Sequence, residues 1–231
     1  MKRGDHLIPL RDSTRSRHFP YLTIIIIILN LYIFFRQFTG SQAELSFIIS
    51  NYAFVPAHLT ANLQSSSFFG LLHTPLITSM FLHGGWFHVI FNMLYLWIFG
   101  DNIEDKLGPV RFLLFYLLCG IAGNLAHVFI DPTSPIPLVG ASGAIAGLLG
   151  AYVITFPRAR VTSLFFVLFF FFIRDIPAIY FILFWFALQV INGVSSLGIM
   201  GSTTAWWAHI GGFVFGILLM ILFRKKERNI V

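Results

Sequence analysis

Residues 138–152 read Leu-Val-Gly-Ala-Ser-Gly-Ala-Ile-Ala-Gly-Leu-Leu-Gly-Ala-Tyr, an apolar stretch rich in small side chains. Two prolines precede it and Pro157 follows it, so we expect a helix that begins near Gly140 and ends before Pro157. Gly143 and Gly147 are four residues apart and share one helix face, where a second helix can approach backbone to backbone. The stretch therefore predicts a helix packed closely against a neighbour.

Ser142 is the hydroxyl nucleophile candidate of this stretch, framed by Gly140 and Gly143. Serine is a common helix N-cap, because its hydroxyl accepts a hydrogen bond from the first turn. A serine nucleophile instead needs a base beside it, because a free hydroxyl is a weak nucleophile at neutral pH. Both interpretations stay open on this stretch alone.

The composition indicates a polytopic membrane protein. Of 231 residues, 57% are hydrophobic and 10% are charged, whereas a soluble domain has about 25% charged residues. The net charge of +6 is interpreted as a topology signal and not as a nucleic-acid-binding surface, because of where the basic residues lie along the chain. The single cysteine, Cys119, lies in an apolar run and can form neither an internal disulfide nor a cysteine-based metal site.

Apolar segments predict six membrane-spanning helices. They cover residues 21–35, 81–99, 112–130, a fourth that contains the opening stretch, 177–191 and 206–223. Residues 161–173 are intensely apolar but too few for a span of about 20 residues, so we expect an interfacial or re-entrant segment there. The mixed segment 39–78 is expected to lie half-embedded in the membrane interface.

The basic residues predict the orientation and the domain organisation. Lys and Arg gather near the N-terminus, in an expected charged turn at 100–111, at 157–160 and at the C-terminus, and the positive-inside rule makes such segments cytoplasmic. Arg36 and Arg174 are the exceptions. The expected organisation is a basic cytoplasmic segment (1–18), a six-span membrane domain (19–223) and a basic cytoplasmic tail (224–231).

Strongly polar side chains within spans are costly and mark a site by default. His88 and Asn92 are four residues apart and share one face of the second span, and His83 lies near the start of that span. Asn124 and Gln189, on other spans, are expected to form hydrogen bonds between helices.

His209 lies one turn into the sixth span, where Gly212 and Gly216 form a second small-residue face. If this face packs against that of residues 138–152, Ser142 and His209 can meet. A neutral imidazole within about 3 Å can take the serine proton and return it to a leaving amine. Because no span carries an acid to orient the histidine, any catalytic unit would be a Ser-His dyad.

A tetrahedral intermediate also needs hydrogen-bond donors aimed at its oxyanion. The backbone N–H of Ser142, the side chain of His88 and the amide of Asn92 are the candidates. The competing chemistry is a metal site built from His83, His88 and His209, since three-histidine zinc sites exist. No HExxH pattern or inward carboxylate supports it, so we expect no metal and no cofactor.

These motifs, taken together, resemble the rhomboid intramembrane serine proteases. The matching residues are Gly140-Ala-Ser142-Gly143, His209 with Gly212, His83 with His88 and Asn92, and the charged stretch 100–108, within a likeness that runs from about residue 44 to 216. The resemblance implies an all-α membrane protein, a six-helix bundle with a short central fourth helix. The bundle would surround a water-filled cavity open to the extracytoplasmic side.

The resemblance also implies the role of each residue. Ser142 would be the nucleophile and His209 the general base and acid, while His88 and Asn92 would stabilise the oxyanion together with the Ser142 N–H. His83 would hold water beside the site. The supporting glycines would be Gly140, Gly143 and Gly212.

The resemblance further implies transmembrane-helix substrates, a lipid-bilayer partner, no nucleic-acid partner and a bacterial plasma membrane location. Residues 192–204 would cap the site. Where some members place a tyrosine that stacks on the histidine, this chain has Ala146, so we expect Trp206 or Trp207 to orient His209. One alternative is an inactive rhomboid-like protein that binds transmembrane helices without cleaving them, and another is a small transporter.

Overall fold

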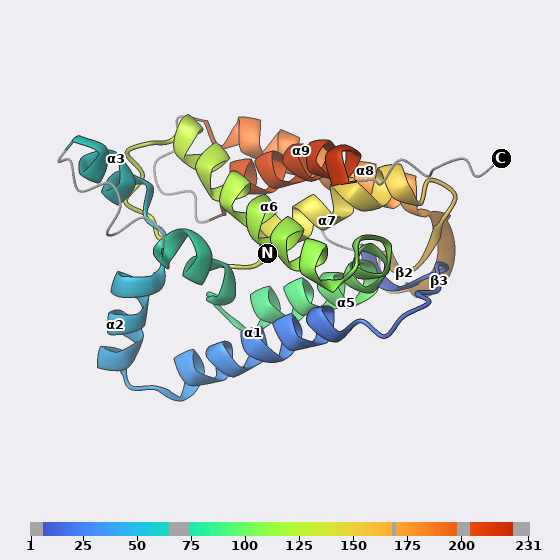
Figure 1. The fold of residues 1–231 in the computed structure, drawn as a ribbon, viewed down its shortest axis with the longest axis horizontal. Helices are drawn as coiled ribbons and strands as arrows, with labels where there is room; N and C mark the ends of the chain where they lie inside the picture. The colour runs from blue at the N-terminus through green and yellow to red at the C-terminus, as the bar shows by residue number, and fades with distance from the viewer. Residues whose placement is uncertain (1–6, 65–73, 168–169, 198–203, 224–231) are drawn as a thin grey trace.

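The computed structural model describes residues 7–64, 74–167, 170–197 and 204–223, and the fold is mostly helical (Figure 1). Helices long and apolar enough to cross a membrane are α1 (Tyr21–Thr39), α6 (Pro109–Ile130), α8 (Ala178–Ser195) and α9 (Trp206–Phe223). Each coincides with a predicted span, and α9 matches its prediction at both ends. The chain is therefore a multi-pass membrane protein. The tail 224–231, residues 65–73 of the first loop and residues 198–203 of the expected cap lie outside the described residues.

The helix that carries His88 and Asn92 is α5 (Trp86–Leu107), which continues through the acidic residues after position 100. The charged turn predicted at 100–111 is therefore wrong. The chain turns instead at Gly108, whose φ of 77° suits glycine, and Pro109 then begins α6.

One acidic residue of α5 explains why the helix persists there. The buried carboxylate of Glu104 accepts hydrogen bonds from the backbone N–H groups of Leu22 (3.0 Å) and Thr23 (2.8 Å). These donors belong to the first turn of α1 and have no acceptor within that helix. Glu104 thus provides the acceptor that these N–H groups lack and links the start of α1 to α5.

The glycine-rich stretch 138–152 contributes most of α7 (Ser142–Thr155), a helix of 14 residues. It begins close to Gly140 and ends before Pro157, as predicted, and every residue from Gly143 to Tyr152 is buried. In Figure 1 it lies within the bundle, behind α6 and beside α9. A helix surrounded by protein in this way presents no lipid-facing side, which fits its small and uniformly apolar composition.

The expectation of an all-α protein is wrong. Residues 160–177 form a hairpin of β2 (Arg160–Val167) and β3 (Phe170–Pro177), and β1 (Leu7–Asp12) joins it in an antiparallel sheet ordered β1-β2-β3. Phe165 pairs with Phe172, and Ile8 pairs with Leu164. Aromatic and β-branched side chains favour strands, so this apolar run, expected to be an interfacial or re-entrant segment, forms a hairpin. Figure 1 places the sheet at one end of the bundle.

The N-terminal segment is part of the fold from Leu7 onward and is not a separate basic arm. The Asp12 carboxylate accepts hydrogen bonds from the Tyr152 hydroxyl near the end of α7 and from Asn102 Nδ2 of α5 (3.0 Å). Burial raises the pKa of Asp12 above its ordinary value, more than the hydrogen bonds from Tyr152 and Thr14 lower it. The first strand is thereby joined to the helix that begins with Ser142 and to the helix that carries His88 and Asn92.

The segment between α1 and α5 contains α2 (Gln42–Tyr52), α3 (Pro56–Gln64) and η1 (Ser79–Phe81). These elements lie at the end of the bundle opposite the sheet (Figure 1). Phe54 and Leu138 exchange backbone hydrogen bonds of 3.2 and 2.7 Å. The segment is therefore bonded to the loop that leads into α7. The half-embedded placement of residues 39–78 remains a prediction.

Candidate active site

Glycines set the distance between α7 and α9. A Cβ on Gly212 would overlap the carbonyl oxygen of Gly143, and a Cβ on Gly216 would overlap that of Gly147. The two predicted small-residue faces therefore pack against each other backbone to backbone, as expected. Sequence analysis missed a third participant on α6, Gly123, whose Cβ would lie 2.6 Å from the carbonyl oxygen of Ala208.

This close packing brings Ser142 and His209 together. Ser142 Oγ lies 2.8 Å from His209 Nε2, a hydrogen bond between residues 67 positions apart in the chain. Ser142 is the first residue of α7, and its side chain does not cap the helix, because the N-cap position belongs to Ala141. The N-cap interpretation is wrong, and the hydroxyl is directed to the imidazole instead.

The orientation of His209 depends on a residue whose role was not foreseen. His209 Nδ1 lies 2.8 Å from Gln189 Oε1 of α8, while Gln189 Nε2 donates to the backbone carbonyl of Trp185 (3.0 Å). Because an amide oxygen only accepts, Nδ1 carries the proton and Nε2 is left free to accept from Ser142. The predicted interhelical hydrogen bond of Gln189 is confirmed, and its partner is the histidine of the dyad.

Aromatic rings also border the imidazole. The ring of Trp206 lies 6.1 Å from that of His209 in an edge-on arrangement, and the ring of Trp185 lies 6.0 Å away in a tilted one. Of the two tryptophans expected to orient His209, Trp206 therefore borders its ring, and Trp185 of α8 was not predicted. The imidazole is thus bordered by two tryptophan rings and hydrogen-bonded to Gln189.

His88 and Asn92 of α5 lie over the chain just before the serine. A Cβ on Gly140 would fall 2.6 Å from His88 Nε2 and 3.5 Å from Asn92 Nδ2. Gly140 has a φ of 121°, and its N–H donates to the carbonyl of Ser79 (2.9 Å). Only a glycine allows both this backbone conformation and this proximity.

The donors expected around an oxyanion are accordingly close to the dyad. Asn92 is buried, and its Nδ2 has no hydrogen-bond partner within the described part of the chain. The backbone N–H of Ser142 belongs to the first turn of α7, whose N–H groups find no acceptor within the helix. A buried donor without a partner is costly, so Asn92 Nδ2 favours an acceptor that enters the site.

His83 precedes α5 and is 2% exposed. Its ring lies 5.1 Å from that of His88, and neither ring nitrogen has a partner among the residues that the structure describes. Gln37 of α1 fixes its backbone, accepting from the His83 N–H (3.0 Å) and donating to its carbonyl (3.4 Å). His83 is thus held beside His88 and away from direct contact with the dyad.

Two further expectations concern the neighbours of the site. Asn124 donates to the carbonyl of Leu76 and to Ser79 Oγ, both at 3.2 Å, which confirms its predicted role as a link between elements. Within the described ranges, no three His, Cys, Asp or Glu side chains are placed to hold a metal ion. The chemistry available to this arrangement is proton transfer and nucleophilic attack by a serine hydroxyl.

Comparison with known proteins agrees with this geometry. The Rhomboid domain model matches residues 72–226. The rhomboid-family protein YdcA of Bacillus subtilis is 35% identical over 155 residues, which cover 67% of this chain and 69% of YdcA.

Two other relatives are longer than the chain. Rhomboid protease GluP of Bacillus subtilis is 49% identical over 76 residues, which cover 33% of this chain and 14% of GluP. The mitochondrial rhomboid protein 1 of Saccharomyces cerevisiae is 29% identical over 147 residues, or 62% of this chain and 40% of the yeast protein. The chain thus spans less than half the length of these two relatives.

Proposed function

Because the chain belongs to the rhomboid family, we propose that it is an intramembrane serine endopeptidase that uses Ser142 and His209 as a catalytic dyad. The observation that carries the proposal is the 2.8 Å hydrogen bond between Ser142 Oγ and His209 Nε2. The bond joins two different helices in the interior of a membrane protein, where a polar pair is costly unless it serves a site.

In this proposal α5 and α7 are the second and fourth of six membrane spans, and the other four are the helices long enough to cross. The sheet end of the bundle would face the cytoplasm together with both termini, in a bacterial plasma membrane. The basic residues near that end and the positive-inside rule support this orientation. Ser142, at the opposite end of α7, would then be reached from the extracytoplasmic side.

The proposed reaction is acyl transfer to serine. Ser142 Oγ attacks the carbonyl carbon of the scissile peptide bond while His209 Nε2 accepts its proton, and the same proton passes to the amine when the C–N bond breaks. The Ser142 N–H, Asn92 and His88 would donate to the oxyanion. A water molecule activated by His209 then hydrolyses the acyl-enzyme, and His83 would keep water near that step.

The proposed substrates are transmembrane helices of other membrane proteins, unwound near the extracytoplasmic surface so that a peptide bond can reach Ser142. A helix satisfies its backbone hydrogen bonds internally, so the substrate helix must unwind locally before the carbonyl of the scissile bond is accessible. The residues between α8 and α9 would cover the site, and displacement of α8 would admit the substrate from the bilayer.

A serine-reactive fluorophosphonate should label the purified wild-type protein at Ser142. An activated serine attacks phosphorus, whereas an unactivated hydroxyl reacts far more slowly. The labelled residue is identified by peptide mass spectrometry, with Ser163→Ala as a matched control, since Ser163 is buried in the sheet away from the dyad. An unlabelled, folded wild-type protein would instead favour the inactive, helix-binding alternative.

Gln189→Leu should lower kcat for a reporter helix by roughly 10- to 100-fold with little change in KM, because the imidazole loses the partner that fixes its tautomer. Gln189→Glu keeps an oxygen acceptor at the same place and should recover most of the rate. The measurement is a paired kcat and KM determination in detergent. If the Leu variant cleaves at the wild-type rate, Gln189 does not position His209.

A further inference from the structure

The arginine at the end of α1 departs from the charge pattern of the chain. Arg36 is the only Lys or Arg between Arg17 and Lys106 in the sequence. It lies in the last turn of α1, next to α2 and at the end of the bundle opposite the sheet (Figure 1). In the orientation proposed above this end is extracytoplasmic, where basic residues are disfavoured, so a positive charge retained there needs a local partner or role.

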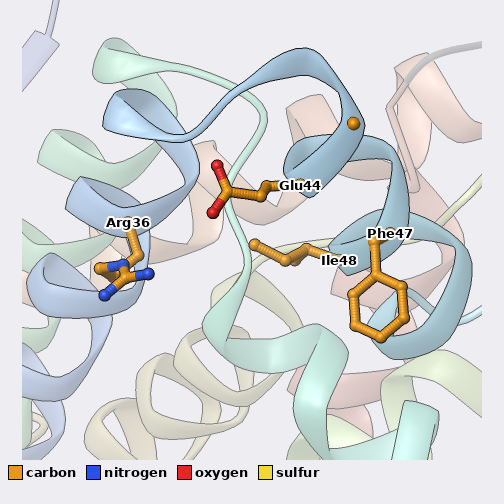
Figure 2. Close-up of a pocket in the computed structure, with 5 residues that line it drawn as sticks. Arg36, Glu44, Phe47 and Ile48 are labelled. Carbon is orange, nitrogen blue, oxygen red and sulfur yellow. The ribbon is translucent and has the colours of Figure 1, made fainter.

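A pocket of about 430 Å³ lies between α1 and α2, lined by Arg36, Ala43, Glu44, Phe47 and Ile48. Figure 2 shows the Arg36 guanidinium on one wall, the Glu44 carboxylate turned toward it from the other, and Ile48 and Phe47 below the carboxylate. The pocket therefore presents one positive group, one negative group and an apolar surface. It lies on elements other than those that carry Ser142 and His209.

The two charged groups do not neutralise each other directly. Within the described part of the chain, Arg36 and Glu44 form no ion pair, and no hydrogen bond occupies the Arg36 guanidinium. Glu44 Oε2 accepts from the backbone N–H (2.7 Å) and the hydroxyl (2.9 Å) of Ser41, and these bonds with the nearby Arg36 charge keep the pKa of Glu44 below its ordinary value. The bonds from Ser41 go to Oε2 alone, and the Glu44 carboxylate is turned toward Arg36 (Figure 2).

Large apolar side chains surround this pair of charges. Phe35 and Phe38 flank Arg36 on α1 and are 57% and 60% exposed, and Phe47 on α2 is 60% exposed. Because α1 is long and apolar enough to cross a membrane and Arg36 lies in its last turn, a bilayer crossed by α1 would bring its headgroups to the level of this pocket.

We propose that this pocket binds a phosphatidylethanolamine molecule of the bilayer. The guanidinium of Arg36 would donate to the phosphodiester, and Glu44 Oε1 would accept from the primary ammonium of the headgroup. An acyl chain would run over Phe47 and Ile48. A zwitterion is the ligand that matches one cation and one carboxylate across a single pocket, and arginine is well suited to phosphate oxygens.

Native mass spectrometry of the purified full chain in detergent tests this site, with three added lipids: phosphatidylethanolamine, phosphatidylglycerol and phosphatidylcholine. The wild type should bind phosphatidylethanolamine about tenfold more tightly than the other two, because only this lipid pairs its phosphate with an ammonium N–H donor. Arg36→Gln should weaken binding of all three lipids. Glu44→Gln should weaken only phosphatidylethanolamine.

The variants are chosen so that the fold survives. Gln serves as well as Glu at the third position of a capping box, so Glu44→Gln leaves the start of α2 intact. Arg174→Gln, an exposed arginine at the opposite end, is the matched control and should bind like the wild type. Equal wild-type affinity for phosphatidylethanolamine and phosphatidylglycerol, or an equal effect of Glu44→Gln on both lipids, would overturn the proposal.

Discussion

Ser142→Ala and His209→Ala should each reduce kcat/KM for a transmembrane reporter helix by at least about a thousandfold. The serine supplies the bond-forming oxygen, and the imidazole 2.8 Å away is the only base that contacts it among the described residues. Residues that act as one unit lose nearly all function when either is removed, so the double variant should be no slower than the single ones.

The assay uses purified protein in detergent, with cleavage followed by gel and product mass spectrometry. Ser163→Ala and His58→Ala are matched controls: the first removes a buried hydroxyl in the sheet, and the second removes an exposed histidine from α3. Both should cleave the reporter at rates close to the wild type. Proteolysis retained by purified Ser142→Ala protein would refute the proposed function.

Gly216→Ala should destabilise the bundle and separate the dyad. Alanine in a helix is ordinarily favoured over glycine by about 1 kcal/mol. Here the added Cβ meets the backbone of Gly147, which cannot rotate away as a side chain can. Overpacking of this kind costs about 1–3 kcal/mol, and the helices must move apart to relieve it.

The expected result is a lower melting temperature in detergent together with loss of fluorophosphonate labelling at Ser142. Gly85→Ala is the matched control, because Gly85 has an extended backbone and a Cβ there meets nothing within 4 Å. A Gly216→Ala protein that melts and labels like the wild type would show that the close approach of α7 and α9 is not required.

Much of the fold follows from periodicity and composition. The start of α7 was predictable because prolines and glycines precede it, and the bounds of α9 because an uncharged Gly/Ser/Thr loop and a basic run enclose an apolar run of the right length. The pairing of Ser142 with His209 was predictable for a similar reason, since glycine-lined faces restrict which helices can approach closely.

The remaining features depend on contacts between distant residues. The 160–177 hairpin needs strand partners that a local pattern cannot supply, and its edge is completed by residues 7–12. Likewise, nothing near Gln189 in the sequence indicates that its oxygen meets His209 rather than another helix. The extension of α5 past position 100 depends on Glu104 serving the first turn of α1.

The attachment of β1 has a consequence for biosynthesis. Leu7–Asp12 pairs with a strand about 150 residues later, and the hydrogen bond from Tyr152 to Asp12 spans 140 positions. When the N-terminus emerges from the ribosome, its partners have not been made. Pairing across such sequence separations is slow because a long loop must close first. The first strand therefore stays unpaired until β2 has been translated, and α8 and α9 are still to follow at that point.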